Sequence, residues 1–280
     1  MHINYTKELT KIKIINADAL KIIAIITMLI DHIGAGLLLY CINYHKCPDV
    51  LSSREWASIY YIMRHIGRIA FPIFCFLIVE GYIHTRSRVR YLRNLAIFSV
   101  ISELFFDITF NLKDSPFEKN MFANILANKD HVLSVQNVYL TLFFGLLTIW
   151  LIDTIFKKLA PLGILNIYQK NYIPAFALSL FIASAIGFFC FKIHTDYSYH
   201  GIILICIFFI LKDEPVIASI LGYITMCYTD SEKYCLPAFI LILLYNGKRG
   251  DFSKKYKFIF YIFYPLHLFI IYLIRIYLIK

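Results

Sequence analysis

Long apolar runs separated by short polar segments make up most of this chain. Polar and apolar residues do not alternate at every second position, so the pattern predicts helices and argues against a barrel of strands. A helix needs roughly 20 apolar residues to cross about 30 Å of hydrocarbon. The runs predict about nine spans, with a range of roughly eight to ten, at Ala19–Cys41, Ala57–Ile83, Tyr91–Asn111, Val135–Phe156, Tyr172–Phe191, Tyr199–Leu211, Pro215–Tyr228, Cys235–Asn246 and Phe258–Ile279.

Composition supports the same fold class. Hydrophobic residues make up 60% of the chain and charged residues 16%, which is typical of a polytopic membrane protein. We therefore expect an all-α transmembrane helical bundle that fills residues 1–280 as one domain. The first span is too long for a secretory signal, carries Asp31 and His32, and precedes no small-residue cleavage site, so we expect it to be retained.

Lysine and arginine gather in alternate loops, which predicts the orientation of the bundle. Cytoplasmic loops carry an excess of these residues. They lie before the first predicted span and after the second, fourth and eighth, including Lys7, Lys11, Lys13, Arg86, Arg88, Arg90, Arg93, Lys157, Lys158, Lys170, Lys248, Arg249, Lys254, Lys255 and Lys257. We therefore predict a cytoplasmic N-terminus and an external C-terminus. The net charge of +10 is explained by this bias, and we expect no nucleic-acid partner.

The seven cysteines form no CxxC pair and no Cys/His cluster at metal-ligand spacing, so we predict no metal site. Most are expected to fill apolar space. Cys41 with Cys47, and Cys227 with Cys235, lie near predicted outer loops and are candidate disulfide pairs.

Asp31 and His32 lie deep in the first apolar run, where an ionisable group costs several kcal/mol unless it has a function or a partner. Lys21 precedes His32 by eleven residues, about three helical turns, so the two share a helix face about 16 Å apart. Neighbouring residues on a helix point about 100° apart. Asp31 therefore need not contact His32, and its partner can lie on another span. A snorkelling lysine and a structural histidine remain the alternatives.

The second predicted span contains Arg64, His65, Arg68 and Glu80. Arg64 and Arg68 are four residues apart and share a face. Pro72 follows Arg68 by four residues and predicts a kink there.

Three further groups of polar residues lie in predicted spans. The third span supplies Glu103 and Asp107, so an ion pair between Arg64 and Asp107 is one expected arrangement. Gln136 and Asn137 open the fourth span and are expected to bond across helices. For His267, which follows Pro265, a capped kink and catalysis both remain open.

These residues alone leave two function classes open. Buried arginine, histidine and acids occur in proton-coupled transporters as well as in membrane enzymes. Inverted repeats would favour transport, and the sequence shows none.

Several sequence blocks, in order, resemble the signatures of the TraX family, the membrane N-acetylases of conjugative pilin. They are ADALKIIAIITMLIDHIG, RHIGRIAFPIFCFLIVEGYIHTR, ISELFFDI, QNVYLTLFFGLL and YNGKRG followed by FIFYIFYPLHL, between Ala17 and Leu268. The pair Lys21 and His32 also resembles the basic-residue, ten-residue gap, histidine motif of the acyltransferase-three group, with lysine in place of the usual arginine. RIAFPIFCFLIVEGY is similar to an aromatic-rich helix of that group.

The resemblance implies a bacterial plasma-membrane enzyme that moves an acetyl group from cytoplasmic acetyl-CoA to an acceptor in or across the membrane. A peptide N-terminal amine is the expected acceptor, and a saccharide hydroxyl is the alternative. Membrane lipids are expected partners, and a homo-oligomer is compatible with the chain.

The resemblance also implies roles for individual residues. His32 is the expected general base, with an acetyl-imidazole intermediate as the alternative. Asp31 would orient the imidazole, Arg68, Asn137 or a backbone N–H would stabilise the oxyanion, and Glu80 completes the catalytic set. The expected contacts for the coenzyme phosphates are Lys21, Arg86, Arg88, Lys248 and Arg249. His65 and His267 are expected in a supporting role, together with the acids of the third span.

Overall fold

The computed structural model describes residues 13–111, 125, 128, 131–252 and 258–279, and its regular elements there are helices joined by turns and two isolated bridges. The elements are α2 (Ala17–Ile33), η1 (Gly34–Leu38), α3 (Leu39–Asn43), α4 (Ser53–Gly67), α5 (Ala70–His84), α6 (Arg88–Phe106), η2 (Asp107–Asn111), α8 (Val138–Leu159), α9 (Tyr172–Lys192), α10 (Ser198–Ile210), α11 (Pro215–Met226), η3 (Glu232–Cys235), α12 (Leu236–Leu243) and α14 (Ile259–Ile279).

Five helical stretches among the described residues are long and apolar enough to cross a membrane, which confirms a helical membrane protein. They are Ala17–Asn43, Ser53–His84, Val138–Leu159, Tyr172–Lys192 and Ile259–Tyr277. The third predicted span forms α6 and η2 and is not among them. The count of nine spans and the orientation of the bundle stay predictions.

The short apolar runs between Tyr199 and Asn246 do form helices, but they are too short for a full crossing. At 1.5 Å per residue, α10 extends about 20 Å, α11 about 18 Å and α12 about 12 Å, against about 30 Å of hydrocarbon.

The described chain divides into two compact units. The first contains Met1–Leu77 and Asp213–Phe263, and the second contains Ile78–Lys212 and Tyr264–Lys280. Helices α5 and α14 each contribute residues to both units.

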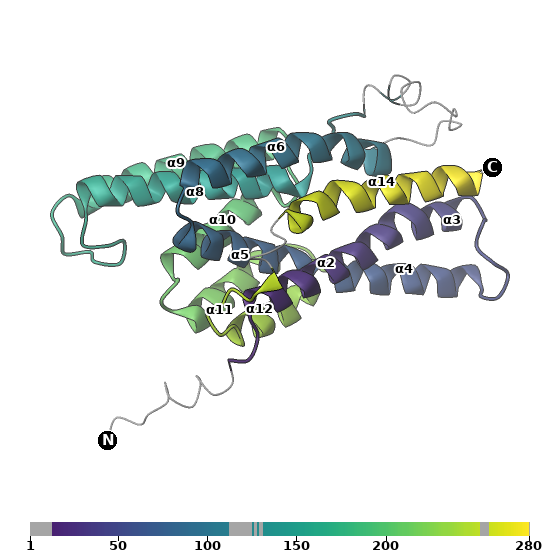
Figure 1. Ribbon diagram of the computed structural model, residues 1–280, viewed down its shortest axis with the longest axis horizontal. Coiled ribbons are helices and arrows are strands. Elements are labelled where there is room, and N and C mark those ends of the chain that lie inside the picture. The colour runs from purple at the N-terminus through teal and green to yellow at the C-terminus, as the bar shows by residue number, and fades with distance from the viewer. Residues whose placement is uncertain (1–12, 112–124, 126–127, 129–130, 253–257, 280) are drawn as a thin grey trace. The chain divides into compact units, whose positions relative to one another are not determined.

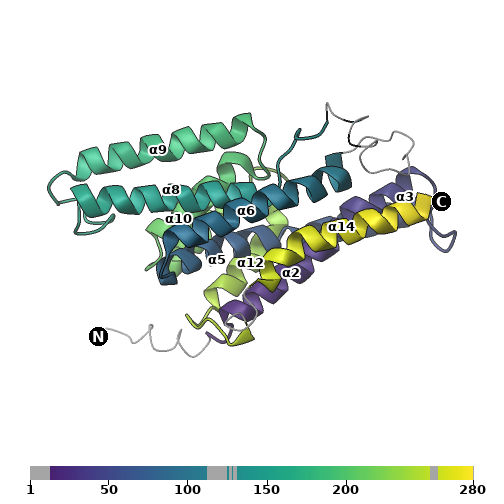
Figure 2. The ribbon, with the colours of Figure 1, turned by 45° about the horizontal axis from the view of Figure 1, so that its top comes forward.

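In the first unit, α2 packs against α4, and α11 packs against α12 (Figure 1). A small apolar core joins three of its helices, because Leu20 and Ala24 of α2, Ile73 of α5 and Ala238 of α12 are fully buried in one cluster. In the second unit, α6, α8 and α9 run side by side, and α10 packs on α8 and α9 (Figures 1 and 2).

Polar side chains at the helix starts explain several element boundaries. The Asn16 side chain accepts a hydrogen bond from the Ala19 N–H at 2.9 Å and caps α2. Ser52 and Glu55 form a reciprocal capping box at the start of α4. Pro215 begins α11, where a missing backbone N–H costs nothing.

The second predicted span is interrupted close to the place the sequence indicated, but not in the predicted manner. Helix α4 ends at Gly67, and α5 begins at Ala70. Pro72 therefore lies in the first turn of a new helix, where proline is tolerated, and does not kink a continuous one. The interruption falls at Arg68.

Some predicted features fall outside the described residues. They are most of the polar loop 112–134 and the basic residues Lys7, Lys11, Lys254, Lys255 and Lys257.

Candidate functional site

The first unit contains a network of ion pairs between α2 and α4. The Arg64 Nη1 donates to the Asp31 Oδ2 at 2.6 Å. Arg68 Nη2 lies 3.8 Å from the other oxygen of the same carboxylate. Asp31, whose partner the sequence does not assign, therefore pairs with two arginines of the second predicted span. The partner of Arg64 is Asp31, not Asp107, which was one expected partner.

Glu232 extends this network from a third element. Arg68 Nη1 donates to Glu232 Oε1 at 2.9 Å, and the side chains of Arg68 and Glu232 are 14% and 4% exposed. Two arginines thus face two carboxylates, so the network is neutral overall, which limits the cost of burying it. Sequence reasoning missed Glu232 because it lies in a short polar segment that looked like an external loop.

Two glycines allow the close approach of α2 and α4. A Cβ atom at Gly67 would overlap the Asp31 side chain, and one at Gly34 would lie 3.1 Å from the Met63 Cβ. Small residues at such crossings let membrane helices approach closely. The ion pairs therefore form where the two backbones are nearest.

His32 follows Asp31 in the last turn of α2 and is partly buried. The π-helical segment η1 begins two residues later, at Gly34. Such segments inside longer helices are frequent at functional sites. Lys21 and His32 lie on the same continuous helix, as the sequence predicted.

Basic residues from two segments meet at the start of α2. The strand-like segment after α12 is tied to this end of the helix, because Asn246 N–H donates to Ile15 O at 2.8 Å and Ala17 N–H donates to Lys248 O at 2.9 Å. Gly250 lies against the Asp18 side chain, and Arg249 is close enough to Lys21 to repel its charge. Three of the predicted phosphate-binding residues, Lys21, Lys248 and Arg249, therefore belong to one end of the first unit.

Lys21 itself is held in place by two contacts. Its Nζ lies 3.6 Å from Asp18 Oδ1 and 5.2 Å from the centre of the Phe260 ring. The ion pair and the cation–π contact keep the ammonium at the start of the helix.

The other two predicted phosphate-binding residues belong to the second unit. Arg88 Nη2 lies 3.2 Å from Asp153 Oδ2, and its guanidinium covers the Tyr82 ring at 4.6 Å. The same carboxylate oxygen accepts hydrogen bonds from Lys157 at 2.7 Å and Tyr82 at 2.5 Å. Arg88 thus has a structural role between α5, α6 and α8, and Arg86 is exposed.

Asn137 is fully buried and caps α8. Its Oδ1 accepts from the Tyr139 N–H at 2.9 Å, and its amide nitrogen donates to Ser99 O at 2.9 Å and also to the Glu103 carboxylate. The bonds to Ser99 and Glu103 of α6 confirm the prediction that Asn137 bonds across helices. Because these bonds occupy the amide, the role of Asn137 is structural, and its amide is not available as an oxyanion donor.

Asp107, four residues after Glu103, anchors the turn before α8. It accepts from the Asn111 side chain at 2.6 Å and from the Leu133 N–H at 3.1 Å. The prediction that the Gln136 side chain bonds across helices is wrong. Its Nε2 donates locally, to Leu133 O at 2.6 Å.

The remaining predicted residues make separate contacts. The His65 ring stacks on Tyr234 with centroids 3.7 Å apart. Glu80 Oε2 lies 3.6 Å from His84 Nε2, one turn along α5. His267 is buried in α14 beside the Tyr264 ring.

A second residue missed by sequence reasoning is Arg275. It is buried in α14 and donates to Thr109 O at 2.9 Å in the π-helical segment η2. An arginine near the end of an apolar run is typical of an interfacial residue, so the sequence gives no signal that Arg275 is buried.

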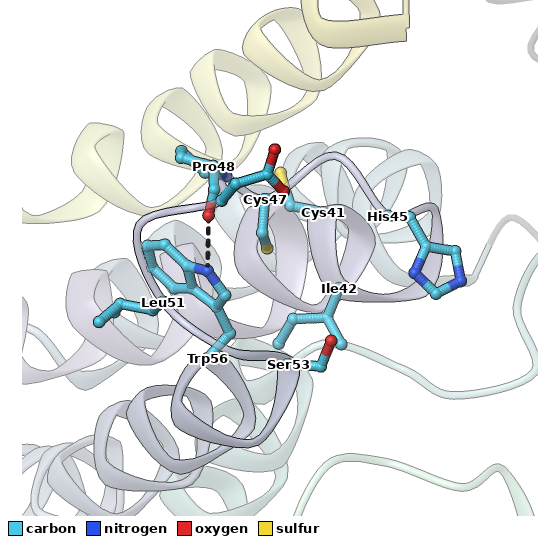
Figure 3. A pocket seen from close by; sticks show the side chains of 9 residues that line it. Cys41, Ile42, His45, Cys47, Pro48, Leu51, Ser53 and Trp56 are labelled. Carbon is cyan, nitrogen blue, oxygen red and sulfur yellow. Dashed lines mark hydrogen bonds between the residues drawn. The ribbon is translucent and has the colours of Figure 1, made fainter.

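A small cavity lies at the turn between α3 and α4 (Figure 3). It measures about 100 Å³ and is lined by both members of one candidate disulfide pair, Cys41 and Cys47, which are free thiols here. The chain turns there through a Schellman cap: Lys46 N–H donates to Cys41 O at 2.8 Å, and His45 N–H donates to Ile42 O at 3.3 Å. Trp56 Nε1 closes the other side by donating to Pro48 O at 3.2 Å.

These observations define a helical membrane protein with a largely buried, charge-balanced network next to a histidine. The chain belongs to the TraX family, because the family model described as TraX protein matches residues 16–275. The resemblance predicted from the sequence is confirmed. The chain is also similar to the probable fimbrial assembly protein FimC, serogroup H1, of Dichelobacter nodosus, with 28% identity over 274 residues that cover 90% of this chain and 93% of that protein. No solved structure matches the chain significantly.

Proposed function

We propose that this TraX family member is a bacterial plasma-membrane acetyltransferase. It moves an acetyl group from cytoplasmic acetyl-CoA to the N-terminal amine of a pilin-like peptide. The observation that carries the proposal is the charge-balanced network of Asp31, Arg64, Arg68 and Glu232 beside His32. Membrane proteins rarely bury such groups without a function. Membership of the TraX family and the similarity to a fimbrial assembly protein support a pilin-like acceptor.

His32 acts as the general base in this proposal. An N-terminal amine has a pKa near 8 in solution, so much of it is protonated and cannot attack. The neutral amine bonds through its nitrogen to the thioester carbon, His32 takes the proton that this nitrogen loses, the carbon–sulfur bond breaks, and His32 passes the proton to the coenzyme thiolate. Asp31 and Arg68 act as positioning residues, because their contacts join α2 to α4 and fix the helix that carries His32.

The basic end of the first unit supports binding of the donor. Phosphate groups need cations, and Lys21, Lys248 and Arg249 come together at the start of α2. His32 lies about 16 Å further along the same helix. With a cytoplasmic N-terminus, this spacing lets a coenzyme held by its phosphates extend its thioester arm toward the middle of the membrane.

Purified protein given labelled acetyl-CoA tests the proposal. We expect label on the N-terminal amine of a pilin-like peptide and none on the same peptide with a blocked N-terminus. Transfer to a saccharide hydroxyl alone would replace the acceptor class. Proton uptake in vesicles without any acetyl transfer would replace the enzyme by a transporter.

A further inference from the structure

The segment from α11 to α12 differs from an ordinary pair of membrane spans. It contains one helix of 12 residues, the single turn η3 and one helix of 8 residues. Each covers well under the thickness of a bilayer, and apolar helices of this length are typical of re-entrant segments.

Hydrogen bonds fix where the far end of this segment lies. The residues that follow α12 bond to the beginning of α2, with Ile15 N–H donating to Leu244 O at 3.0 Å and Asn246 N–H donating to Ile15 O at 2.8 Å. Since α11 and α12 pack together as an antiparallel pair, the start of α11 lies toward the same end (Figure 1).

Contacts with residues of α4 and with Arg68, which directly follows it, indicate the membrane depth of the tip, the turn between α11 and α12. Glu232 accepts from Arg68 at 2.9 Å, and Tyr234 stacks on His65. Arg68 is 15 residues beyond Ser53, about 22 Å along α4, and its other partner Asp31 is about 21 Å along α2 from Ala17. The helical stretches that carry these residues, Ala17–Asn43 and Ser53–His84, are 27 and 32 residues long, or about 40 and 48 Å. Both routes therefore put the tip near the middle of a stretch that is long enough to cross the bilayer.

Charged residues at this tip are exposed. The Asp230 side chain is fully exposed, and that of Lys233 is 54% exposed. The thiol of Cys227 is exposed as well. Irregular backbone with charged side chains persists at membrane depth only where protein covers it or water reaches it. Because these side chains are exposed, water must reach them.

We propose that α11, η3 and α12 form a re-entrant hairpin whose tip, residues 227–234, lies at mid-membrane depth at the end of an aqueous passage that is wide enough to leave the Asp230 side chain fully exposed. The passage opens on the face opposite the start of α2. One part of this proposal rests on the proposed function: the passage is the route by which a polar acceptor reaches the network around Asp31.

Thiol labelling in intact cells and inverted vesicles tests the hairpin, with the Cys227 peptide read by mass spectrometry. Asp49→Cys marks the outer loop, Lys248→Cys marks the end where α2 begins, and buried Cys235 is the unreactive control. We expect a small charged maleimide to modify Cys227 from the side that modifies Asp49→Cys. A bulky polyethylene glycol maleimide should modify Asp49→Cys at least tenfold faster than Cys227.

Three results would overturn the proposal. Equal reaction of both reagents at Cys227 would show a tip in an open external loop. No reaction of either reagent would show a tip covered by lipid or protein. Reaction only from the side of Lys248→Cys would show a passage of the opposite polarity. Labelling does not depend on catalysis, so a passage without acetyl transfer would refute the proposed function alone.

Discussion

Arg64 of α4 donates to Asp31 of α2 across the closest approach of the two helices, with 2.6 Å between Nη1 and Oδ2. The pair is one link in a chain of charges that continues through Arg68 to Glu232. The chain joins three elements that are distant in sequence, so each link can be tested separately.

Removing Glu232 should destabilise the protein. Glu232→Gln leaves the Arg68 guanidinium buried with one carboxylate fewer, and breaking a buried pair in this way costs about 3–5 kcal/mol. Thermal unfolding in detergent should show a clear fall in Tm. Asp230→Asn, a fully exposed acid of the same segment, is the matched control and should leave Tm unchanged.

Exchanging the charges of Arg68 and Glu232 should restore part of the Tm that is lost when one charge alone is changed. In the double variant Arg68→Glu with Glu232→Arg, the ion pair can form again with opposite polarity, so its Tm should exceed that of Arg68→Glu alone. Equal Tm values in the two variants would mean that the pair contributes no coupling.

A methyl group at Gly67 should disturb the helix crossing. Gly67→Ala places a Cβ in the space of the Asp31 side chain, so α2 and α4 must separate or the ion pair must break. Gly34→Ala meets Met63 at 3.1 Å, where a small shift suffices, and should lower Tm less. The reverse order of the two effects would contradict the described crossing.

Basic residues in the two units should respond differently to charge reversal. Lys248→Glu with Arg249→Glu should raise the KM for acetyl-CoA at least tenfold, and more at low than at high salt. Arg88→Glu should instead lower Tm, because it brings a second carboxylate to Asp153. If Arg88→Glu changed only the KM, the coenzyme site would include the second unit.

Cys41 and Cys47 should form a disulfide in cells. Both line one cavity, and the Schellman turn brings the chain back on itself between them. Burial and the neighbouring Cys41 raise the pKa of the Cys47 thiol, so spontaneous reaction is slow. On the predicted orientation the pair faces the outer compartment, where an oxidoreductase would supply the oxidising disulfide. The closed loop should stabilise the turn by about 2 kcal/mol.

Differential alkylation of denatured, acid-quenched cells checks this pair. Both cysteines should react only after reduction, whereas buried Cys75 should react before it. Alkylation of Cys41 and Cys47 without reduction would show that the pair stays reduced.

Helix positions and the family could be predicted from the sequence because both depend on local pattern. Apolar runs marked the five long stretches, and the buried charges marked Asp31, Arg64 and Arg68. The partners could not be predicted, since helical geometry gives the direction of a side chain but not the neighbouring element. The partner Glu232 is missed for this reason. For Asn137 the sequence predicts both a bond across helices and an oxyanion donor, and the structure confirms the first. Apolarity alone does not give the depth of a helix in the membrane, so the sequence does not distinguish full spans from short re-entrant helices at α11 and α12.

Acetyl transfer by His32 variants tests the central claim most directly. Loss of a general base should lower kcat about 100-fold or more, so His32→Ala and His32→Asn should lose transfer of labelled acetyl to the peptide amine while keeping Tm. His84→Ala, which replaces a 69% exposed histidine at the end of α5, should keep full activity. Full activity in both His32 variants would contradict the account.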